Sequence, residues 1–363
     1  MNNKKTFTFF IPGLNKTRLN TSLWGQFGDE LSAFNSLFSK AKIIDGLALD
    51  SCIRYFELVE LFDLHYTRAI DLPFANIFYS NFLSEQPKTD KTAQNFWVYN
   101  VSPVVLYPDM DQLILADNLT EQINDEQAKE ICQVINSFFT ETEQDKTWQL
   151  VYYAKNQWFI ISEQQLINQP MPADRMGKAL TRSTVKNDMA SYWIQTLNEI
   201  QMLLFSLGQK QQQKSTQALS VCNSLWIWGE SYFSCFEQQP HLNRWDTIYS
   251  DNFLLQQLAQ YTHTPCKANN KFNLIEQQTA ANSLIVLNEL EEAIRSEDAL
   301  AIVDVLKAYE ERYFVPIKQA LLADKNLSVN IISNAKQLYS INRSSLKSWW
   351  KRTKNTGKIL ELL

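Results

Sequence analysis

Histidine is the rarest of the residues that could carry acid–base or metal chemistry in this sequence. The 363-residue chain has only three, His65, His241 and His263. A site that holds two metal ions with several imidazole ligands cannot easily be built from so few. We expect His65, near Asp63 and Asp71, to be a structural histidine, and the other two to lie on surface loops.

Nucleophilic chemistry also has little support. The five cysteines are widely spaced and never form CxxC, which argues against a disulfide framework or a zinc ribbon. Cys222 lies just before a predicted strand, and we expect it to be a small buried hydrophobe. The sequence contains no GxSxG turn, and no GxGxxG or GxxxxGKS/T loop for phosphate.

Two tryptophans could form a ligand platform. Trp226 and Trp228 alternate with apolar residues in a predicted strand at 224–228, so both indoles point to one face. With polar neighbours on this strand and the preceding helix, they form our candidate ligand-binding set: Asn198, Glu199, Gln201, Asn223, Trp226, Trp228 and Glu230. In the alternative, which the usual burial of tryptophan favours, the indoles pack under a helix and the polar groups form hydrogen bonds with backbone groups at strand and helix ends.

The C-terminal region is locally basic, with no acidic residue between Arg343 and Glu361. Six residues could contact an anionic partner: Arg343, Lys347, Trp349, Trp350, Lys351 and Arg352. Basic side chains interleaved with aromatic rings are typical of nucleic-acid contacts, but the net charge of −5 disfavours that partner. The alternative, which we favour, is a docked terminal helix with a solvated basic edge, anchored by Trp349 or Trp350.

The elements that would position these residues alternate between strands and helices in most of the chain. The apolar run Thr6–Ile11 ends at Pro12-Gly13 and predicts a buried strand followed by a turn. Further strands are expected at 283–287 and 327–332, with a helix between them. This alternation predicts an α/β fold with a mostly parallel sheet.

A second pattern interrupts this alternation. Strands are expected at 95–101, 104–107, 112–116, 148–153 and 158–162. Asn124 and Gln127 form a capping-box pattern before a helix whose apolar face contains Ile131 and Ile135. We therefore expect an inserted α+β subdomain at 95–165 and a core formed by 1–90 and 170–363.

The composition is that of an ordinary globular protein, with 45% hydrophobic and 20% charged residues. No apolar run approaches the ~18 residues of a membrane span, so we expect no membrane partner. The N-terminal sequence MNNKKTFTFFIPG has too short an apolar run for a secretion signal. The cytoplasm is the expected compartment.

Several segments together resemble a known superfamily. They are FFIPGL (9–14), ADNLTEQINDEQAKEICQVINSFF (116–139), LNEIQMLL (197–204), NSLWIWG (223–229) and SLKSWWKR (345–352). Through them the chain resembles the cofactor-independent phosphoglycerate mutases, especially the archaeal type, of the alkaline-phosphatase-like superfamily. It resembles more closely still the RpfE-type bacterial regulatory proteins. The resemblance implies a three-layer alkaline-phosphatase-like core with an inserted subdomain.

The mutase chemistry needs two divalent ions held by Asp and His, and the matching positions here lack these residues. Where the family has Asp-Gly after the first strand, this chain has Pro12-Gly13. Where the family has Asp-His after the last strand, this chain has Ser333-Asn334. The stretch that should carry another Asp and His, 287–298, contains no histidine. Oxygen ligands in that stretch could come from Asn288, Glu289 or Asp298.

The substrate-binding arginines of the family are also replaced. Its Tyr-Arg pair corresponds to 148–153, which has no arginine, and its Arg-Gly to Trp228-Gly229. Tryptophan cannot grip phosphate bidentately as arginine does.

Three functional hypotheses follow. In the first, this is a catalytically inactive mutase-like protein with a regulatory role, which binds an unknown protein or a small anionic ligand and holds no metal or cofactor. In the second, it is a divalent-metal-dependent phosphomutase or phosphatase with rearranged ligands, drawn from Asp45, Asp50, Asp246, Asp251 and Asp298. The third is a structural subunit of an assembly.

Overall fold

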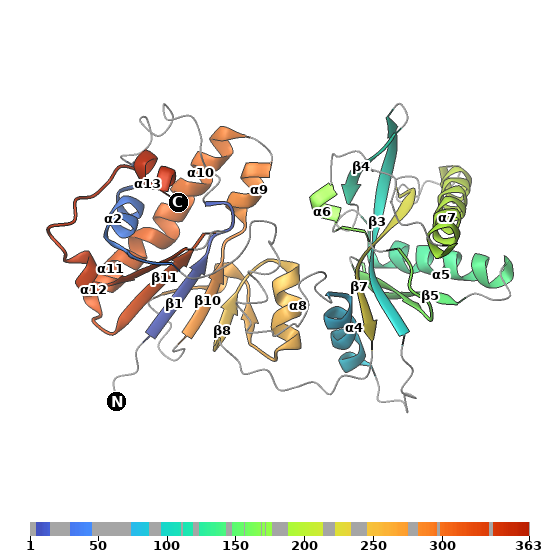
Figure 1. Cartoon of the computed structure of the whole chain (residues 1–363), viewed down its shortest axis with the longest axis horizontal. Helices are drawn as coiled ribbons and strands as arrows, with labels where there is room; N and C mark the ends of the chain where they lie inside the picture. Colours follow the sequence, from blue (N-terminus) through green and yellow to red (C-terminus); the bar gives the residue numbers. More distant parts are fainter. Residues whose placement is uncertain are drawn as a thin grey trace. The chain divides into compact units, whose positions relative to one another are not determined.

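A computed structural model of the chain describes most of its residues. These are 5–14, 30–45, 74–86, 96–109, 112–118, 123–142, 147–155, 157–167, 169–170, 172–175, 188–212, 222–233, 245–274, 282–295, 298–333 and 337–362. The chain divides into two compact units, one made of Met1–His65 and Pro240–Leu363, the other of Tyr66–Gln239 (Figure 1). Within the described residues, no helix has the length and apolar character needed to cross a bilayer.

The first unit is built on a seven-stranded sheet with the order β2-β12-β11-β1-β10-β8-β9. The strands are β1 (Lys5–Phe10), β2 (Lys42–Asp45), β8 (Thr247–Tyr249), β9 (Cys266–Lys267), β10 (Asn282–Val286), β11 (Leu327–Ile332) and β12 (Gln337–Asn342). The central strand β1 is parallel to both β10 and β11, and only β12 and β2 pair antiparallel. The predicted α/β fold with a mostly parallel sheet is thus confirmed.

Strand β1 is buried on both faces from Phe7 to Phe10, as expected for a central strand of a parallel sheet. Phe7 and Phe9 join a large core cluster, and Phe10 is buried on the opposite face. The strand is followed by the expected turn, in which Gly13 takes φ +85°. A side chain there would be strained, and a Cβ would lie 2.7 Å from Ile294 Cδ1.

The helices of this unit are short and mostly follow the strands. They are α2 (Ser32–Lys40), α8 (Phe253–Tyr261), the 3-10 turn η4 (Asn269–Lys271), α9 (Glu289–Arg295), α10 (Ala299–Tyr309), the π-helix η5 (Glu310–Phe314), α11 (Val315–Ala323), α12 (Arg343–Leu346) and α13 (Thr356–Leu362). Residues of α2, α10, η5, α11 and α13 pack with β1 and β11 in one hydrophobic cluster.

A buried carboxylate joins the N-terminal part of this unit to its C-terminal part. The N-cap residue of α2, Leu31, has no side-chain oxygen to accept the first helical N–H groups. Glu310, which begins the π-helix η5 and is only 5% exposed, accepts from the Ala33 N at 2.5 Å and from the Phe34 N at 2.8 Å. It therefore caps α2 from 277 residues away along the chain and places negative charge at the positive helix end.

The second unit is built on an antiparallel sheet with the order β4-β3-β6-β5, to which β7 adds by pairing with β3. Its elements are α4 (Phe74–Glu85), β3 (Phe96–Asp109), β4 (Gln112–Asn118), α5 (Asp125–Thr142), β5 (Trp148–Ala154), β6 (Gln157–Ser162), α6 (Pro172–Arg175), α7 (Asp188–Gln212) and β7 (Ser224–Phe233). Helix α5 contains Ile131 and Ile135 and begins with the expected reciprocal capping box of Asn124 and Gln127.

This unit is wider than the expected 95–165 segment. Helices α5 and α7 cover one face of its sheet, and α4 packs on the other (Figure 1). Strand β7 buries Leu225 and Ile227 in the same cluster as β3, α5 and α7. The strand at 224–228 therefore belongs to this antiparallel sheet and not to the parallel core, which corrects the expected boundaries. Its alternating pattern fits either sheet, so only its partners decide the assignment.

The expected anchoring of the C-terminal tail by tryptophan is wrong. Trp349 is 87% exposed and Trp350 is 67% exposed. The tail is held instead by apolar residues on either side of them, Leu346, Ile359 and Leu360, which are buried in the core. Aliphatic side chains of this size fit the space between α2 and the tail, and the indoles are left outside.

The capping of α2 by Glu310 can be tested by replacing Glu310 with Gln. The amide keeps the shape but loses the charge, and one of its two ends becomes a donor that faces an N–H donor. Because hydrogen bonds to charged groups contribute about 1.5–3 kcal/mol, we expect Glu310→Gln to lower the free energy of unfolding by about 2–3 kcal/mol. Urea denaturation followed by circular dichroism measures this.

The matched control is Glu311→Gln, because Glu311 is the next residue and is exposed. It should leave the denaturation midpoint unchanged. Hydrogen exchange adds a local readout, in which the amides of Ala33 and Phe34 exchange faster in Glu310→Gln only. Equal midpoints for the two variants would show that the carboxylate does not hold α2.

Candidate functional site

The carboxyl ends of parallel strands are the usual ligand site of an α/β sheet. At this edge β1 is followed by Pro12 and Gly13, and β11 by the buried Ser333. Helix α9 packs closely on the turn after β1, since Ile294 and Glu291 lie next to Gly13. The turn after β1 is therefore bordered at Gly13 by an aliphatic side chain and by Glu291.

The acidic residues at this edge already have hydrogen-bond partners. Tyr309 donates its hydroxyl hydrogen to Glu289 Oε2 at 2.7 Å. Burial, and next the neighbouring Glu289 carboxylate, raise the pKa of Tyr309, so it stays a neutral donor. After β8, Asp251 Oδ1 accepts weakly from the Asn269 N at 3.3 Å. Glu291, next to Gly13, is a further buried acid, and Asn269, Tyr313 and Ser333 add neutral buried polar atoms that make no hydrogen bond within the described residues.

The carboxylates proposed for a rearranged metal site are not brought together. Asp246 precedes β8 and accepts from the Asn282 N, whereas Asp251 follows β8 at the other end. At about 3.3 Å per residue these two lie roughly 15 Å apart along the strand. Asp298 caps α10 by accepting from the backbone of Leu300 and Ala301.

Two further candidates add nothing to that site. Asp45 ends β2, the strand at the far side of the sheet from β8, and Asp50 lies outside the described residues. His263 is exposed after α8, and His65 and His241 lie outside the described residues. Among the residues that the structure describes, no group of three or more His, Cys, Asp or Glu side chains could hold a metal ion.

Asn223 and Gln201 of the candidate ligand-binding set form hydrogen bonds with protein groups. Asn223 clamps the backbone of Leu106, accepting from its N at 2.8 Å and donating to its O at 2.9 Å. Gln201 Nε2 donates to Ser224 Oγ at 3.1 Å. Asn198 and Glu199 point to solvent from α7. Asn223 therefore bonds to backbone, as the structural alternative expects, whereas Gln201 bonds to a side chain and Asn198 and Glu199 face solvent.

The tryptophans of the same set pack inside the second unit. Trp228 is 9% exposed, donates to Ser102 Oγ at 3.1 Å, and lies against Phe74 and Phe78 of α4. Trp226 is buried and donates to the Pro170 carbonyl at 2.7 Å. Glu230 accepts a hydrogen bond from Gln165. Trp226 and Trp228 therefore take part in the packing of the second unit.

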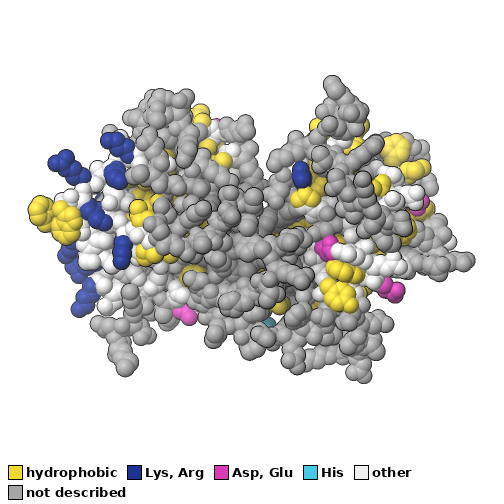
Figure 2. Space-filling view, viewed as in Figure 1, with side chains coloured by type: hydrophobic (Ala, Val, Ile, Leu, Met, Phe, Trp, Pro, Cys, Tyr) yellow, Lys and Arg dark blue, Asp and Glu magenta, His cyan; other side chains and the backbone are white. Residues whose placement is uncertain are grey.

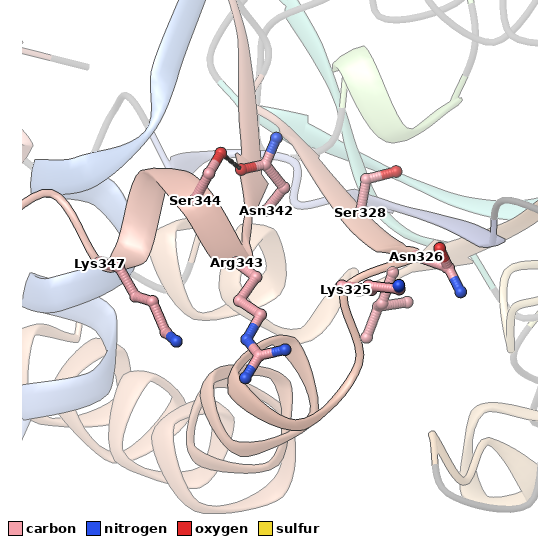
Figure 3. Close-up of a pocket in the computed structure, with 8 residues that line it drawn as sticks. Lys325, Asn326, Ser328, Asn342, Arg343, Ser344 and Lys347 are labelled. Carbon is pink, nitrogen blue, oxygen red and sulfur yellow. Dashed lines mark hydrogen bonds between the residues drawn. The ribbon is translucent and has the colours of Figure 1, made fainter.

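A basic pocket lies at the opposite edge of the parallel sheet. It has a volume of about 620 Å³ and is lined by Lys325, Asn326, Leu327, Ser328, Asn342, Arg343, Ser344 and Lys347 (Figure 3). These residues come from the start of β11 and from the junction of β12 with α12. Because β11 runs parallel to β1 and β10, the pocket lies at the amino edge and not at the carboxyl edge.

Local hydrogen bonds fix the start of α12, from which two cations of this basic pocket extend. Asn342 and Ser345 form a reciprocal capping box, with bonds of 3.0 and 3.1 Å, that starts α12. Arg343 and Lys347 are four residues apart and therefore share a face of the chain. In Figure 3 the Arg343 guanidinium lies between Lys347 and Lys325. Its Nε is buried and makes no hydrogen bond within the described part of the chain.

The remaining lining supplies neutral hydrogen-bonding groups. Ser344 Oγ donates to Asn342 Oδ1 at 2.7 Å, and Asn326 is held in a turn by Asp324, which accepts from its N at 2.8 Å. From Lys325 to Leu360 the sequence contains no Asp or Glu. The pocket thus combines three cations with hydroxyl and amide groups, which suits an anion that has several oxygens.

Sequence reasoning found part of this pocket. Arg343 and Lys347 were in the predicted partner-contact set, but Lys325 was not, because it lies on a turn before β11. The acid-free stretch that begins at Lys325 was the available signal. The other predicted contact residues lie beyond the pocket, in the turn after α12: Trp349, Trp350, Lys351 and Arg352.

Comparison with known proteins gives a fold relationship. The sequence matches no protein-family model, and it matches no curated protein. The structure is similar to that of the PH0037 protein from Pyrococcus horikoshii, with a TM-score of 0.55 and 9% identity over 94% of this chain and 88% of that one. It was also matched to the cofactor-independent phosphoglycerate mutase from Thermoplasma acidophilum, with a TM-score of 0.46 and 12% identity over 99% of both chains.

Cys222 gives a test of whether a nucleophile is present near β7. The thiol is 1% exposed, and burial raises its pKa to about 12. Since only the thiolate reacts, and about one thiol in ten thousand would be ionised near pH 8, we expect no labelling of Cys222 by iodoacetamide in the native protein. Peptide mass spectrometry measures the labelling.

Cys132 is an internal control, because burial also raises its pKa. Both cysteines should be labelled fully in denaturant. Rapid labelling of native Cys222, with Cys132 still protected, would show an accessible thiolate and reopen a nucleophilic role.

Proposed function

We propose that this protein uses a mutase-like framework for binding and not for phosphoryl transfer, with the basic pocket as its ligand site. The observation that carries this proposal is the distribution of charge over the two edges of the parallel sheet. The carboxyl edge carries the acidic residues Glu289, which is engaged by Tyr309, and Glu291, whereas the amino edge has Lys325, Arg343 and Lys347 around one pocket. A regulatory role, in which occupancy of the pocket is what the cell senses, is part of this proposal.

The residue types at the carboxyl edge support the non-catalytic half of the proposal. Phosphoryl transfer in the mutases that the sequence resembles needs charges that neutralise the moving phosphoryl group. Proline at position 12 has no ligating atom, and Ser333 stands where that family has Asp. Of the carboxylates at this edge, Glu289 is engaged by Tyr309 and Asp251 accepts from the Asn269 N, and among the described residues no group of three His, Cys, Asp or Glu side chains could hold a metal ion.

The chemistry of the basic pocket favours a phosphorylated small molecule. Arginine binds phosphate oxygens in pairs, and lysine adds a point charge that tolerates several geometries. The side-chain amides of Asn326 and Asn342 can donate to further oxygens. A cavity of about 620 Å³ lies within the range of small-molecule sites. Lys325 and Lys347 are exposed, so we expect the affinity to fall as salt rises.

The first test is metal content and mutase activity. We expect protein purified without chelator to hold no stoichiometric manganese or zinc and to show no phosphoglycerate mutase turnover with added manganese and magnesium. Losing one oxyanion donor already lowers a rate about 10²–10³-fold, and replacing metal-ligand residues should lower it further. Elemental analysis and a coupled assay measure these quantities.

An active cofactor-independent mutase, assayed in parallel, is the control for the assay itself. Two ions bound per chain, or turnover that chelator abolishes, would contradict the proposal. That result would support the metal-dependent alternative with carboxylates from outside the described residues.

The second test concerns the basic pocket. We expect phosphoglycerate and inorganic phosphate to raise the melting temperature, because a ligand that binds only the folded state stabilises it. The double variant Arg343→Ala/Lys347→Ala should weaken binding by at least tenfold in calorimetry. The control Lys271→Ala removes an exposed lysine from η4, outside the pocket, and should bind as the unaltered protein does. Equal binding by both variants would place the anion site elsewhere.

A further inference from the structure

Two adjacent tryptophans project into solvent from the turn between α12 and α13. Trp349 and Trp350 are the most exposed tryptophans that the structure describes, at 87% and 67%. Their ring centroids are 6.2 Å apart and the planes meet at 85°. Exposing two large aromatic side chains together is unfavourable in water, which points to a surface that is covered when the protein works.

The turn that carries these rings is held in place at both ends. Ser348 N donates to the Ser345 carbonyl at 3.2 Å, and Lys351 N to the Ser348 carbonyl at 3.3 Å. The end of α2 adds three bonds across the fold. Lys40 Nζ donates to the Leu346 carbonyl, Lys351 Nζ to the Ala41 carbonyl, and Lys354 N to Ser39 Oγ. The rings are therefore presented by an ordered turn, which reduces the entropy lost on docking.

Cations surround this turn and no carboxylate interrupts them in the sequence. Lys347, Lys351, Arg352 and Lys354 are exposed, and the acid-free stretch extends from Lys325 to Leu360. Figure 2 shows Lys and Arg side chains gathering at the end of the first unit that carries α12, with hydrophobic side chains projecting among them. We call residues 347–354 the aromatic-basic turn.

We propose that the aromatic-basic turn docks the protein onto the surface of a bilayer that contains anionic lipid. An indole has an apolar body and a polar N–H, and it lies favourably at the level of lipid headgroups. The four cations would lie over the anionic headgroups, each contributing about a fivefold gain in partition. The expectation of no membrane partner rested on spanning segments, and surface docking needs none.

The geometry of the rings favours a bilayer over a single-stranded nucleic acid. Successive bases stack on aromatic faces along a groove. Trp349 and Trp350 are almost perpendicular to each other and lie on an exposed turn outside the basic pocket. A projecting edge-to-face pair with cations beside it matches insertion into an interface better than it matches a row of stacked bases.

This inference goes beyond the proposed function and does not depend on it, although Lys347 belongs both to the basic pocket and to the aromatic-basic turn. The lining of the basic pocket includes neither tryptophan. A variant without the two indoles should still bind phosphoglycerate in calorimetry, so failure of one proposal leaves the other standing.

The test is flotation of the full chain with vesicles of phosphatidylcholine alone or with about one third phosphatidylserine. We expect the unaltered protein to float with the phosphatidylserine vesicles only, and to be released by high salt. Trp349→Ala/Trp350→Ala should reduce the bound fraction by at least tenfold. Arg352→Glu/Lys354→Glu, which reverses two exposed charges, should abolish binding.

Two matched controls separate docking at this turn from general stickiness. Met202→Ala/Phe205→Ala removes two exposed apolar side chains from α7, and Lys129→Glu/Lys271→Glu reverses two exposed charges elsewhere. Both should float as the unaltered protein does. Circular dichroism should show all four variants folded, since each changes exposed side chains.

Three outcomes would overturn the proposal. One is no flotation that depends on phosphatidylserine. Another is flotation that survives in both Trp349→Ala/Trp350→Ala and Arg352→Glu/Lys354→Glu. The third is a single-stranded oligonucleotide that binds the unaltered protein and prevents flotation, with both turn variants losing it, which would assign the turn to nucleic acid.

Discussion

The capping of α2 by Glu310 is the contact on which the basic end of the first unit depends. It fixes a helix that has no cap of its own to a π-helix from the other end of the chain. Helix α2 then holds the C-terminal tail through Asn35, which accepts from Thr356 Oγ1 at 2.9 Å, and through Ser39. A buried charge in the core thus determines where the exposed charges of the tail lie. The π-helix η5 is the local irregularity that accompanies this arrangement. Such irregularities are frequent at functional sites.

The sequence predicted those elements whose signals are local. The run before Pro12-Gly13 gave a buried strand with its turn, and Asn124 with Gln127 gave a helix start that both predicted bonds confirm. It could not predict which sheet receives the strand at 224–228. That strand has the same alternation in either place, and its partner β3 lies more than a hundred residues earlier. Pairing over such distances depends on tertiary contacts that one sequence does not display.

The candidate site likewise contains residues that local sequence patterns predict and residues that only tertiary contacts bring in. Arg343 and Lys347 could be chosen because they lie in a basic stretch without acidic residues, whereas Lys325 joins them only through the antiparallel pairing of β11 with β12. Trp349 and Trp350 were expected inside because tryptophan is usually buried. Burial of Leu346, Ile359 and Leu360 on both sides leaves the indoles outside, and a residue-type preference cannot anticipate this competition.

The two edges of the parallel sheet are too far apart to contact the same small ligand. The six residues of β11 separate the pocket, which lies before the strand, from Ser333, which follows it. At the usual rise per residue this separation is about 20 Å. An anion held by Arg343 and Lys347 cannot contact the groups at the carboxyl edge, so its binding needs neither metal ligands nor a nucleophile there. Substitutions at the carboxyl edge could therefore accumulate without disturbing the amino edge. The sheet thus supports its two edges independently.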